Sequence, residues 1–479
     1  MTFLKMHRFA LFVMLLAAVP VAAQSGRVLT AGSPNGPAAA ADSGGLSVKQ
    51  MFDEANSYLR TKAAEFEAKK IRFSDAKLAQ LQIEQKQLAA RYAAAAGTRK
   101  DLNGEDFYYL GMLHWIAENL DGTRENLAKF VASEGSAADR SQTSRSILTV
   151  VLSKQKNAEE AEKALAEYLK NQPQRLTERA RMESELAKAY QEKKDFVRMA
   201  PHAEEAFAAA KALLADASSR ARGLDEILDT GMLVFEAHRD GGNSEKAIAA
   251  LDDLVTAGVT TQTPSLYYYA ADAKITYLID LGQKPKALAY YQTALENAQR
   301  DLATPPLRAD ADRRLKARER HYRLLGETAL ELPAVDQWFP GTPKKFTDLK
   351  GKVVLLDFWA TWCGPCLDAF PALREWHQDF AGEGLEILGV TRYYGESGGL
   401  PKDMPAELEY LKRYRVSKGL PYDFVVAKGQ SNQILYGATA LPTAVLIDRK
   451  GVVRYIATGT SSTRLEEIRA MIIKLLAEK

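Results

Sequence analysis

The chain of 479 residues contains only two cysteines, Cys363 and Cys366, and they lie within one short segment. With no other cysteine available, no structural disulfide can join distant parts of the fold. No cysteine lies near the N-terminus either, so we do not expect a bacterial lipoprotein of the usual kind. The two thiols therefore indicate a single site of thiol chemistry, in the segment that contains Cys363 and Cys366.

Other features are scarce as well. The formal net charge is only +3, which gives no reason to expect a nucleic acid or another polyanion as partner. Beyond the N-terminus, no apolar run approaches the roughly 18 to 20 residues that a membrane-spanning helix needs. No histidines pair at metal-binding spacing, so we expect no metal site. The six are His7, His114, His202, His238, His321 and His377.

The N-terminus has the three parts of a secretory signal peptide. A basic start (1–8) precedes an apolar run (9–19), and small residues follow at Val21 and Ala23. We expect cleavage after Ala23, giving a signal peptide of residues 1–23 and a periplasmic or secreted protein without a stable membrane span. An uncleaved membrane anchor is the alternative. Residues 24–46 are rich in Ala, Gly, Ser and Pro and are interpreted as a flexible linker.

Residues 47–328 have the composition and apolar spacing of an all-α domain. A small or apolar residue followed by apolar residues four and seven positions later recurs, which resembles tetratricopeptide helical hairpins. A non-repetitive helical bundle is the alternative. Such a domain would bind a protein partner. The recurring positions are Ala161, Leu165 and Tyr168, then Ala247, Leu251 and Leu254, then Ala287, Tyr291 and Ala294.

From about residue 329 to 479 the pattern changes to short β-branched runs between turns, which predicts an α/β domain with a mixed sheet flanked by helices. Asp448–Gly451 has the composition of a hairpin turn, and Thr463–Glu466 that of a capping box. The Gly-rich loop 393–401 lacks a phosphate-binding lysine pattern and is interpreted as a rim of the site. Strands are expected at 353–358, 385–391, 423–427, 443–448 and 452–457, with helices after Cys366, at 405–416 and from Thr463 onward.

The cysteine pair follows the apolar strand and the aromatic segment Phe358–Trp362, with Gly364 and Pro365 between the thiols. A thiol at a helix N-terminus faces unpaired backbone N–H groups and the positive end of the helix dipole, which favour the thiolate. Pro365 fits the first helical turn. Two sulfurs at this spacing can close into a disulfide and reopen through a mixed disulfide, which makes the pair a reversible redox couple.

Residues 346–479 resemble the thioredoxin-like TlpA/ResA family of exported disulfide reductases. The resemblance rests on the run Leu349–Cys366 and on Leu441-Pro442-Thr443 leading to Gly451. It implies a thioredoxin-like fold and protein disulfides as substrates. It also implies a thiol electron donor and no cofactor other than the Cys363–Cys366 disulfide.

The resemblance also implies residue roles. Cys363 would attack, Cys366 would resolve the mixed disulfide, and Asp357 would be a buried carboxyl group that moves the proton. The Leu441–Pro442 bond would be cis and would face the substrate. The remaining substrate-binding residues would be Trp362, Gly364 and Pro365, with Trp359 either beside them or in the core. Many relatives have a glutamate where this chain has Ala369, so proton handling falls to Asp357 alone.

The expected function is therefore an exported thiol–disulfide oxidoreductase that reduces protein disulfides, with the helical region binding a partner. A disulfide-forming oxidase of the same fold is the nearest alternative, because sequence does not fix the reduction potential. A scaffold protein with a passenger thioredoxin domain is the alternative from another class. A thiol peroxidase is disfavoured, because the Pro, Thr and Cys arrangement of a peroxidatic site is missing.

Overall fold

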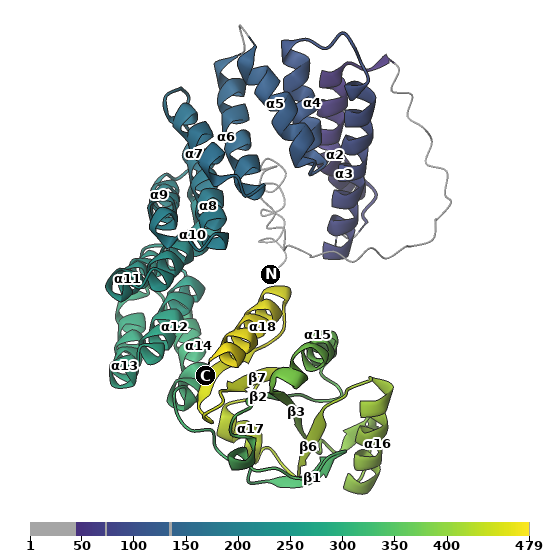
Figure 1. Cartoon of the computed structure of the whole chain (residues 1–479), viewed down its shortest axis with the longest axis vertical. Helices are drawn as coiled ribbons and strands as arrows, with labels where there is room; N and C mark the ends of the chain where they lie inside the picture. The colour runs from purple at the N-terminus through teal and green to yellow at the C-terminus, as the bar shows by residue number, and fades with distance from the viewer. Residues whose placement is uncertain (1–44, 72–73, 134–136, 479) are drawn as a thin grey trace. The chain divides into compact units, whose positions relative to one another are not determined.

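The structure, a computed structural model, describes residues 45–71, 74–133 and 137–478. The predicted signal peptide 1–23 lies outside the described residues, as does all but the end of the predicted linker 24–46. The chain forms two compact units (Figure 1), of which the first ends at Leu254 and the second spans Val255–Lys479. Each unit is described by itself.

The first unit is helical throughout its regular structure, as the sequence predicts. Polar N-cap side chains such as Ser74, Asn103 and Asp195 accept hydrogen bonds from the first-turn amides of their helices, which satisfies donors that have no partner within the helix. The helices are α2 (Val48–Ala68), α3 (Asp75–Gly97), α4 (Gly104–Ile116), α5 (Leu120–Ala132), α6 (Ala138–Lys154), α7 (Ala158–Leu169), α8 (Leu176–Glu192), α9 (Phe196–Ala215), α10 (Arg220–Asp240) and most of α11 (Ser244–Thr260).

Small residues let neighbouring helices approach closely. A Cβ atom on Gly111 of α4 would lie 2.6 Å from a methyl carbon of Leu127 in α5, and one on Gly231 of α10 would lie 2.5 Å from Leu254 in α11. All nine recurring positions predicted from the sequence are buried. The packing positions are thus found where the pattern places them, and the assignment to tetratricopeptide repeats stays a prediction.

The second unit begins with helices as well. These are the end of α11, then α12 (Pro264–Asp280), α13 (Lys284–Asp301) and α14 (Pro305–Leu324). They pack on one another through buried aromatic residues, with the rings of Tyr291 and Tyr322 5.5 Å apart. The compact units therefore divide the chain well before the predicted composition boundary at 328/329, because α14 also contacts the C-terminal sheet.

The rest of the second unit is built on a six-stranded mixed sheet in the order β1-β6-β3-β2-β7-β8. β2 is parallel to β3, and β3 to β6, while the other neighbours are antiparallel. The strands are β1 (Val335–Phe339), β2 (Val353–Phe358), β3 (Leu385–Arg392), β6 (Asp423–Ala427), β7 (Thr443–Ile447) and β8 (Val453–Thr458), and the helices are α15 (Gly364–Phe380), α16 (Met404–Ser417), α17 (Ser431–Tyr436) and α18 (Ser462–Ala477).

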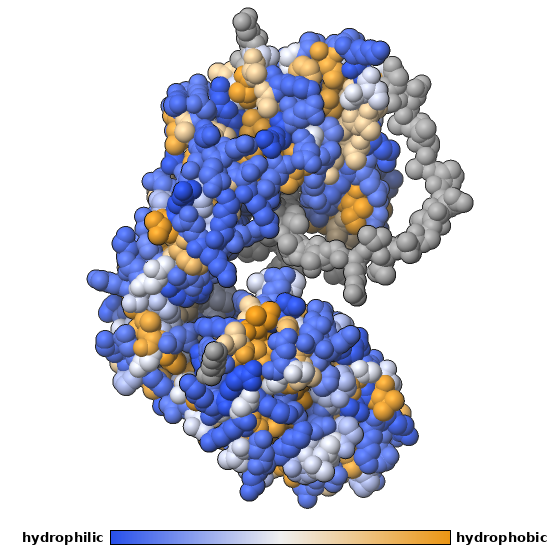
Figure 2. All heavy atoms as spheres, viewed as in Figure 1, coloured by the Kyte–Doolittle hydropathy of each residue, from blue (hydrophilic) through white to orange (hydrophobic). Residues whose placement is uncertain are grey.

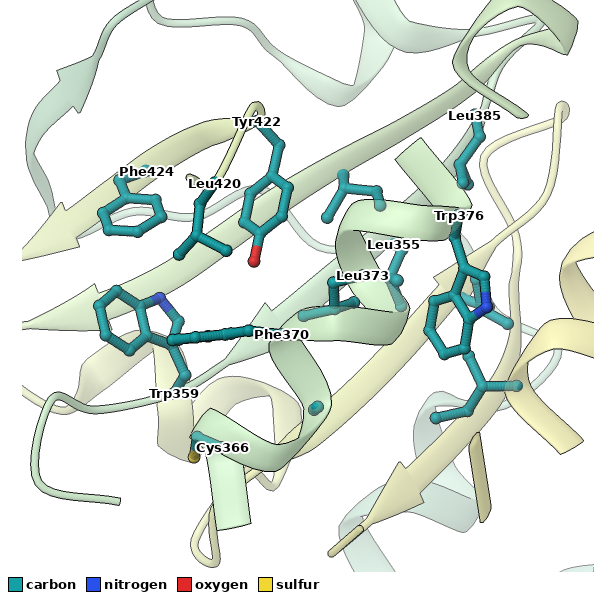
Figure 3. Close-up of a cluster of buried hydrophobic side chains, with 14 of the residues drawn as sticks. Leu355, Trp359, Cys366, Phe370, Leu373, Trp376, Leu385, Leu420, Tyr422 and Phe424 are labelled. Atoms are coloured by element: carbon teal, nitrogen blue, oxygen red, sulfur yellow. The ribbon is translucent and has the colours of Figure 1, made fainter. Parts of the chain in front are cut away.

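Helices cover both faces of this sheet, which confirms the predicted fold class. Successive strand residues point to opposite faces, so Val353, Leu355 and Asp357 share one face of β2. That face carries a core built with residues of α15, α16 and α18, part of which is drawn in Figure 3. On the opposite face, Phe358 packs against Tyr436 at the end of α17, with their rings 5.6 Å apart.

The five predicted strands are confirmed, with bounds that differ by a residue at most. The sequence missed β1, the short hairpin of β4 (Glu396–Ser397) and β5 (Leu400–Pro401), and α17. The hairpin turn is confirmed, because Asp448 accepts hydrogen bonds from the amides of Lys450 and Val452, and Gly451 has φ +85°. The capping box is wrong: α18 begins two residues earlier, and Ser461 caps it.

The segment between α14 and β1 joins the helices to the sheet. The amide of Gly326 donates to the carbonyl of Val453 (2.8 Å), and the amide of Val453 donates to Glu327 (2.9 Å). The amide of Ala329 donates to Gly451 (2.8 Å), and Thr328 lies opposite Val452 in an antiparallel bridge. Residues 326–329 therefore pair with the start of β8 as an added strand.

The visible surface is mainly hydrophilic, with small scattered apolar areas (Figure 2). In the part of the chain that the structure describes, no helix combines the length and apolar character that crossing a membrane requires. The large apolar side chains that remain exposed include Trp362, Leu400 and Ile434, all in the second unit.

Candidate active site

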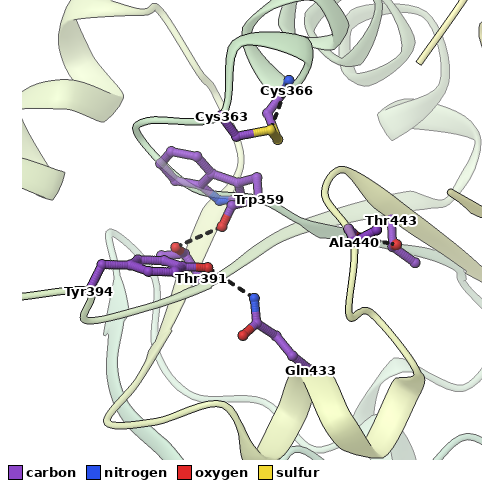
Figure 4. The surroundings of a disulfide bond; sticks show 8 residues. All are labelled: Trp359, Cys363, Cys366, Thr391, Tyr394, Gln433, Ala440 and Thr443. Atoms are coloured by element: carbon purple, nitrogen blue, oxygen red, sulfur yellow. Dashed lines mark hydrogen bonds between the residues drawn. A yellow bond between two sulfur atoms is a disulfide. The ribbon is translucent and has the colours of Figure 1, made fainter. Parts of the chain in front are cut away.

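The two cysteines form a disulfide at the start of α15 (Figure 4). Cys363 is the N-cap residue of the helix, with extended backbone angles, and Pro365 occupies the first turn. The backbone N–H of Cys366 points at the sulfur of Cys363, with N and Sγ 3.2 Å apart. The same N–H group also donates to the carbonyl of Cys363 (3.1 Å), and its contact with the sulfur would stabilise negative charge on Cys363 after reduction. The helix begins at Gly364, which agrees with the predicted place of Pro365 in the first turn, although the helix was otherwise expected only after Cys366.

The two tryptophans of the motif have separate environments. Trp362 is 56% exposed beside the disulfide, whereas Trp359 is fully buried and stacks on Tyr414. Trp359 is thus a core residue, one of the two possibilities left open by the sequence. Both cysteines are largely covered, with 4% of Cys363 and 1% of Cys366 exposed. Exposure therefore separates the two thiols only slightly, and the N-cap position of Cys363 distinguishes them better.

Asp357 lies in the central strand β2, between Gly389 of β3 and Ala444 of β7. Its side chain points to the face that α15 covers and is only 4% exposed. The oxygen Oδ2 has no hydrogen-bond partner among the described residues. Burial raises the pKa of Asp357 to about 7, because an unpaired charge in the core is poorly solvated. The carboxyl group can therefore gain or lose a proton near neutral pH.

The Leu441–Pro442 peptide bond is cis, as the resemblance implied. Two contacts hold the loop around it: Thr443 Oγ1 donates to the carbonyl of Ala440 (2.7 Å), and the amide of Gly459 donates to the carbonyl of Pro442 (2.8 Å). Among the described residues, none forms a hydrogen bond with the backbone N–H or carbonyl of Leu441. These groups are free to pair with an extended peptide.

A wall of the site comes from residues that the sequence did not single out. The ring of Tyr394 meets Trp362 edge to face at 5.3 Å, and the guanidinium group of Arg392 lies 4.1 Å from the centre of the Tyr394 ring. The side-chain amide of Gln433, in α17, donates to the Tyr394 hydroxyl (3.0 Å). The predicted rim loop is thus tied both to Trp362 and to α17.

A buried carboxylate secures the same loop. Glu407, in the first turn of α16, accepts hydrogen bonds from the amides of Tyr394 (2.8 Å) and Gly395 (3.0 Å). Only the position of Glu407 after the N-cap Asp403 could have hinted at this role in the sequence. At the position where a family glutamate was expected, Ala369 is buried in α15.

The predicted residues gather in one region of the second unit, at the carboxyl end of β2, the start of α15 and the loop before β7. Among the described residues, no cluster of three or more His, Cys, Asp or Glu side chains could hold a metal ion. A sheet of this order, with a redox-active cysteine pair at a helix start, defines a thioredoxin-like thiol–disulfide oxidoreductase.

Comparison with known proteins gives the family. Residues 326–456 match the AhpC/TSA family. The thiol-disulfide oxidoreductase ResA of Geobacillus thermodenitrificans is 35% identical over 136 residues, which cover 28% of this chain and 70% of the relative. ResA of Bacillus subtilis is 36% identical over 118 residues, covering 24% of this chain and 58% of the relative. The chain belongs to the ResA family of thiol–disulfide oxidoreductases through its C-terminal region.

Solved structures match about a third of this chain. A thiol-disulfide isomerase from Corynebacterium glutamicum aligns with 32% of this chain and 98% of its own length, at 22% identity and a TM-score of 0.28.

Proposed function

We propose that this protein is an exported reductase of protein disulfides. The observation that carries the proposal is the position of Cys363 at the N-cap of α15, with the Cys366 amide directed at its sulfur. That arrangement lowers the free energy of a thiolate at Cys363, which is the nucleophile in thiol–disulfide exchange. Export is supported by the N-terminal pattern of residues 1–23.

The proposed reaction has two exchange steps. The Cys363 thiolate attacks one sulfur of a substrate disulfide, forming a mixed disulfide and releasing the other substrate sulfur as a thiolate. Asp357 then accepts the proton of Cys366, whose thiolate attacks Cys363 Sγ and displaces the second substrate sulfur. The substrate gains two electrons, and the Cys363–Cys366 disulfide is left. A thiol donor reduces it again.

Substrate binding is assigned to the surface around the disulfide. The free backbone groups of Leu441 would pair with an extended segment of the substrate, next to Pro442. Trp362 offers an exposed apolar face, and Gly364 and Pro365 shape the approach to Cys363. The space beside Gly364 is open, because a Cβ atom there would have no neighbour within 4 Å.

The reducing direction is supported by the Gly364-Pro365 pair between the thiols. A reductase of thioredoxin type has a potential of about −270 mV, whereas a strong oxidase of this fold lies near −120 mV. Equilibration of the purified protein with glutathione buffers measures this potential. A measured reduction potential near −120 mV would favour the disulfide-forming oxidase.

The mechanism is tested by trapping on the full chain. Cys366→Ser cannot resolve the mixed disulfide, so substrate proteins should remain bound to Cys363 and be identified after non-reducing electrophoresis. Cys363→Ser is the matched control and should retain none. Insulin-disulfide reduction should disappear in both variants. Should the native protein fail to reduce insulin and the Cys366→Ser variant trap nothing, the proposal fails and the scaffold alternative gains support.

A further inference from the structure

Helix α17 contacts both walls of the disulfide site. Gln433, in its middle, holds the Tyr394 ring that packs against Trp362. At its end the chain turns through Gly437, with the amide of Ala438 donating to the carbonyl of Gln433 (2.7 Å), and then continues directly to Leu441 and Pro442. The position of α17 therefore sets the position of both the aromatic wall and the cis-proline loop.

This helix is too short to be stable by itself. It has six residues, and its N-cap residue makes no side-chain hydrogen bond. Isolated helices well beyond this length are already marginal in water, since forming the first turn fixes several residues for a single hydrogen bond. Contacts from elsewhere must hold α17.

Helix α14 supplies such contacts at the end of α17. Arg320 donates from Nε to the carbonyl of Leu435 (2.7 Å), and Nε2 of His321 lies 2.9 Å from the carbonyl oxygen of Gly437. A Cβ atom on Gly437 would lie 2.7 Å from the His321 ring, and Gly437 has φ +68°. Both the close approach of α14 and the left-handed backbone therefore require glycine at this turn.

The surroundings of His321 fix its tautomer. Nη1 of Arg318 lies 2.7 Å from Nδ1 of His321, and a guanidinium group only donates hydrogen bonds, so Nδ1 is the acceptor. The proton of the neutral ring is then on Nε2, which donates to Gly437. Arg318 is itself held by Asp272 of α12 (3.0 Å) and donates to the carbonyl of Ile456 in β8 (3.2 Å). Burial and the Arg318 charge both lower the pKa of His321, to about 4, which keeps the ring neutral.

We propose that α14 positions the substrate-binding side of the disulfide site, with His321 as a positioning residue that fixes the turn leading to Pro442. The helices before the sheet are then part of the catalytic unit, and a change in α14 is transmitted to substrate binding without any contact with the cysteines. The inference rests on the proposed function for its kinetic test.

The test compares substitutions of His321 in the full chain. His321→Leu removes the donor to Gly437, whereas His321→Gln keeps an N–H donor at a similar distance from the backbone. We expect His321→Leu to raise the KM for a peptide disulfide about fivefold or more, and His321→Gln to restore it to within about twofold. The alkylation rate of reduced Cys363 by iodoacetamide should stay unchanged in both, because the N-cap geometry of α15 is not altered.

The matched control is Leu315→Ala. It removes a fully buried apolar side chain from the same helix and leaves the hydrogen bonds to Leu435 and Gly437 in place. Its KM should equal that of the native protein, even where its thermal stability falls as much as that of His321→Leu. An equal rise in KM would show that general destabilisation of α14 is responsible, and the inference would be overturned.

Hydrogen exchange gives a readout that does not depend on activity. The amides of Ala438 and Gly459 hold the two ends of the cis-proline loop, and they should exchange faster in His321→Leu than in the native protein, with His321→Gln close to native. Unchanged exchange together with unchanged KM in a folded His321→Leu variant overturns the inference while leaving the proposed reductase activity intact. Lack of activity in the native protein would instead refute the proposed function.

Discussion

At Asp357, the raised pKa links the stability of the protein to pH. The carboxyl group has a pKa of about 7 in the folded protein, against an ordinary value of 3.8. Between these values the folded state holds a proton that the unfolded state has lost. Stability is therefore highest below pH 4 with respect to this group and falls as pH rises toward 7. At 1.36 kcal/mol for each pH unit, the loss amounts to roughly 4 kcal/mol as an upper bound.

We predict that Asp357→Asn is more stable than the native protein at pH 8 and that the difference shrinks toward pH 5. The amide has nearly the shape of the carboxyl group and carries no charge to bury. Urea denaturation of the oxidised proteins at both pH values measures this. A variant that is less stable than the native protein at pH 8 would contradict the cause given for the raised pKa.

The same substitution tests the proposed proton acceptor. If Asp357 takes the proton of Cys366, the rate of mixed-disulfide resolution should rise with pH through about 7 in the native protein and lose this dependence in Asp357→Asn. Single-turnover reduction of a peptide disulfide gives that rate. A profile unchanged by the substitution would assign the proton to another group.

The candidate reactive residues could be predicted from the sequence because they are close together in it. Cys363, Cys366 and Asp357 lie within ten residues, and Pro442 opens a recognisable strand. The residues that hold these reactive residues in place could not be predicted from the sequence. Glu407 holds the Tyr394 loop from another helix, and His321 lies 116 residues before the carbonyl that it contacts. Nothing local in the chain marks such pairs.

Among the elements, α18 shows how a local pattern can mislead. Thr463 with Glu466 has the spacing of a capping box, but Ser461 occupies the N-cap and accepts a hydrogen bond from the amide of Arg464 (3.1 Å). Four hydroxyl residues stand in succession at 460–463 and offer several possible starts, and serine caps helices at least as well as threonine.

The contributions of Ser461 and Thr463 to the stability of α18 can be measured separately. Ser461→Ala should lower the free energy of unfolding by about 0.5 to 2 kcal/mol, because it removes the cap. Thr463→Ala lies inside the helix, where alanine has the higher helix propensity, and should change stability by less than about 0.5 kcal/mol. Urea denaturation of the two variants separates the two positions, and the reverse order would support the pattern read from the sequence.

The predicted and missed elements differ in what stabilises them. β2 is buried along its whole length, so its apolar run Val353–Leu356 marks it in the sequence. β1 has only five residues and no regular alternation of apolar and polar side chains, and α17 has six residues. Both depend on contacts with distant segments, β1 on β6 and α17 on α14, and the chain alone gives little sign of them.

At the scale of the molecule, the sheet depends on residues that precede it. Three backbone hydrogen bonds join residues 326–329 to the start of β8, and Arg320 and His321 add two more to the turn after α17. Net contributions of about 0.5 to 1.5 kcal/mol for each of these five hydrogen bonds give roughly 2.5 to 7.5 kcal/mol in all.

We therefore predict that a fragment of residues 262–479 is more stable than one of residues 330–479 by several kcal/mol. A third fragment, residues 326–479, keeps the added strand without α14 and should lie between them. Urea denaturation of the reduced and oxidised forms of each fragment gives the order of their free energies of unfolding. Equal stability of all three fragments would mean that neither the added strand nor α14 supports the sheet.

The added strand has a consequence for molecules in a crowded solution. An outer strand such as β8 carries backbone donors and acceptors that could pair with a strand of another molecule, which is a common start of aggregation. Here Glu327 and Gly326 occupy both backbone groups of Val453, and Arg318 takes the carbonyl of Ile456. The chain thereby occupies part of this border of its own sheet, which leaves fewer backbone groups of β8 for pairing with a strand of a neighbouring copy.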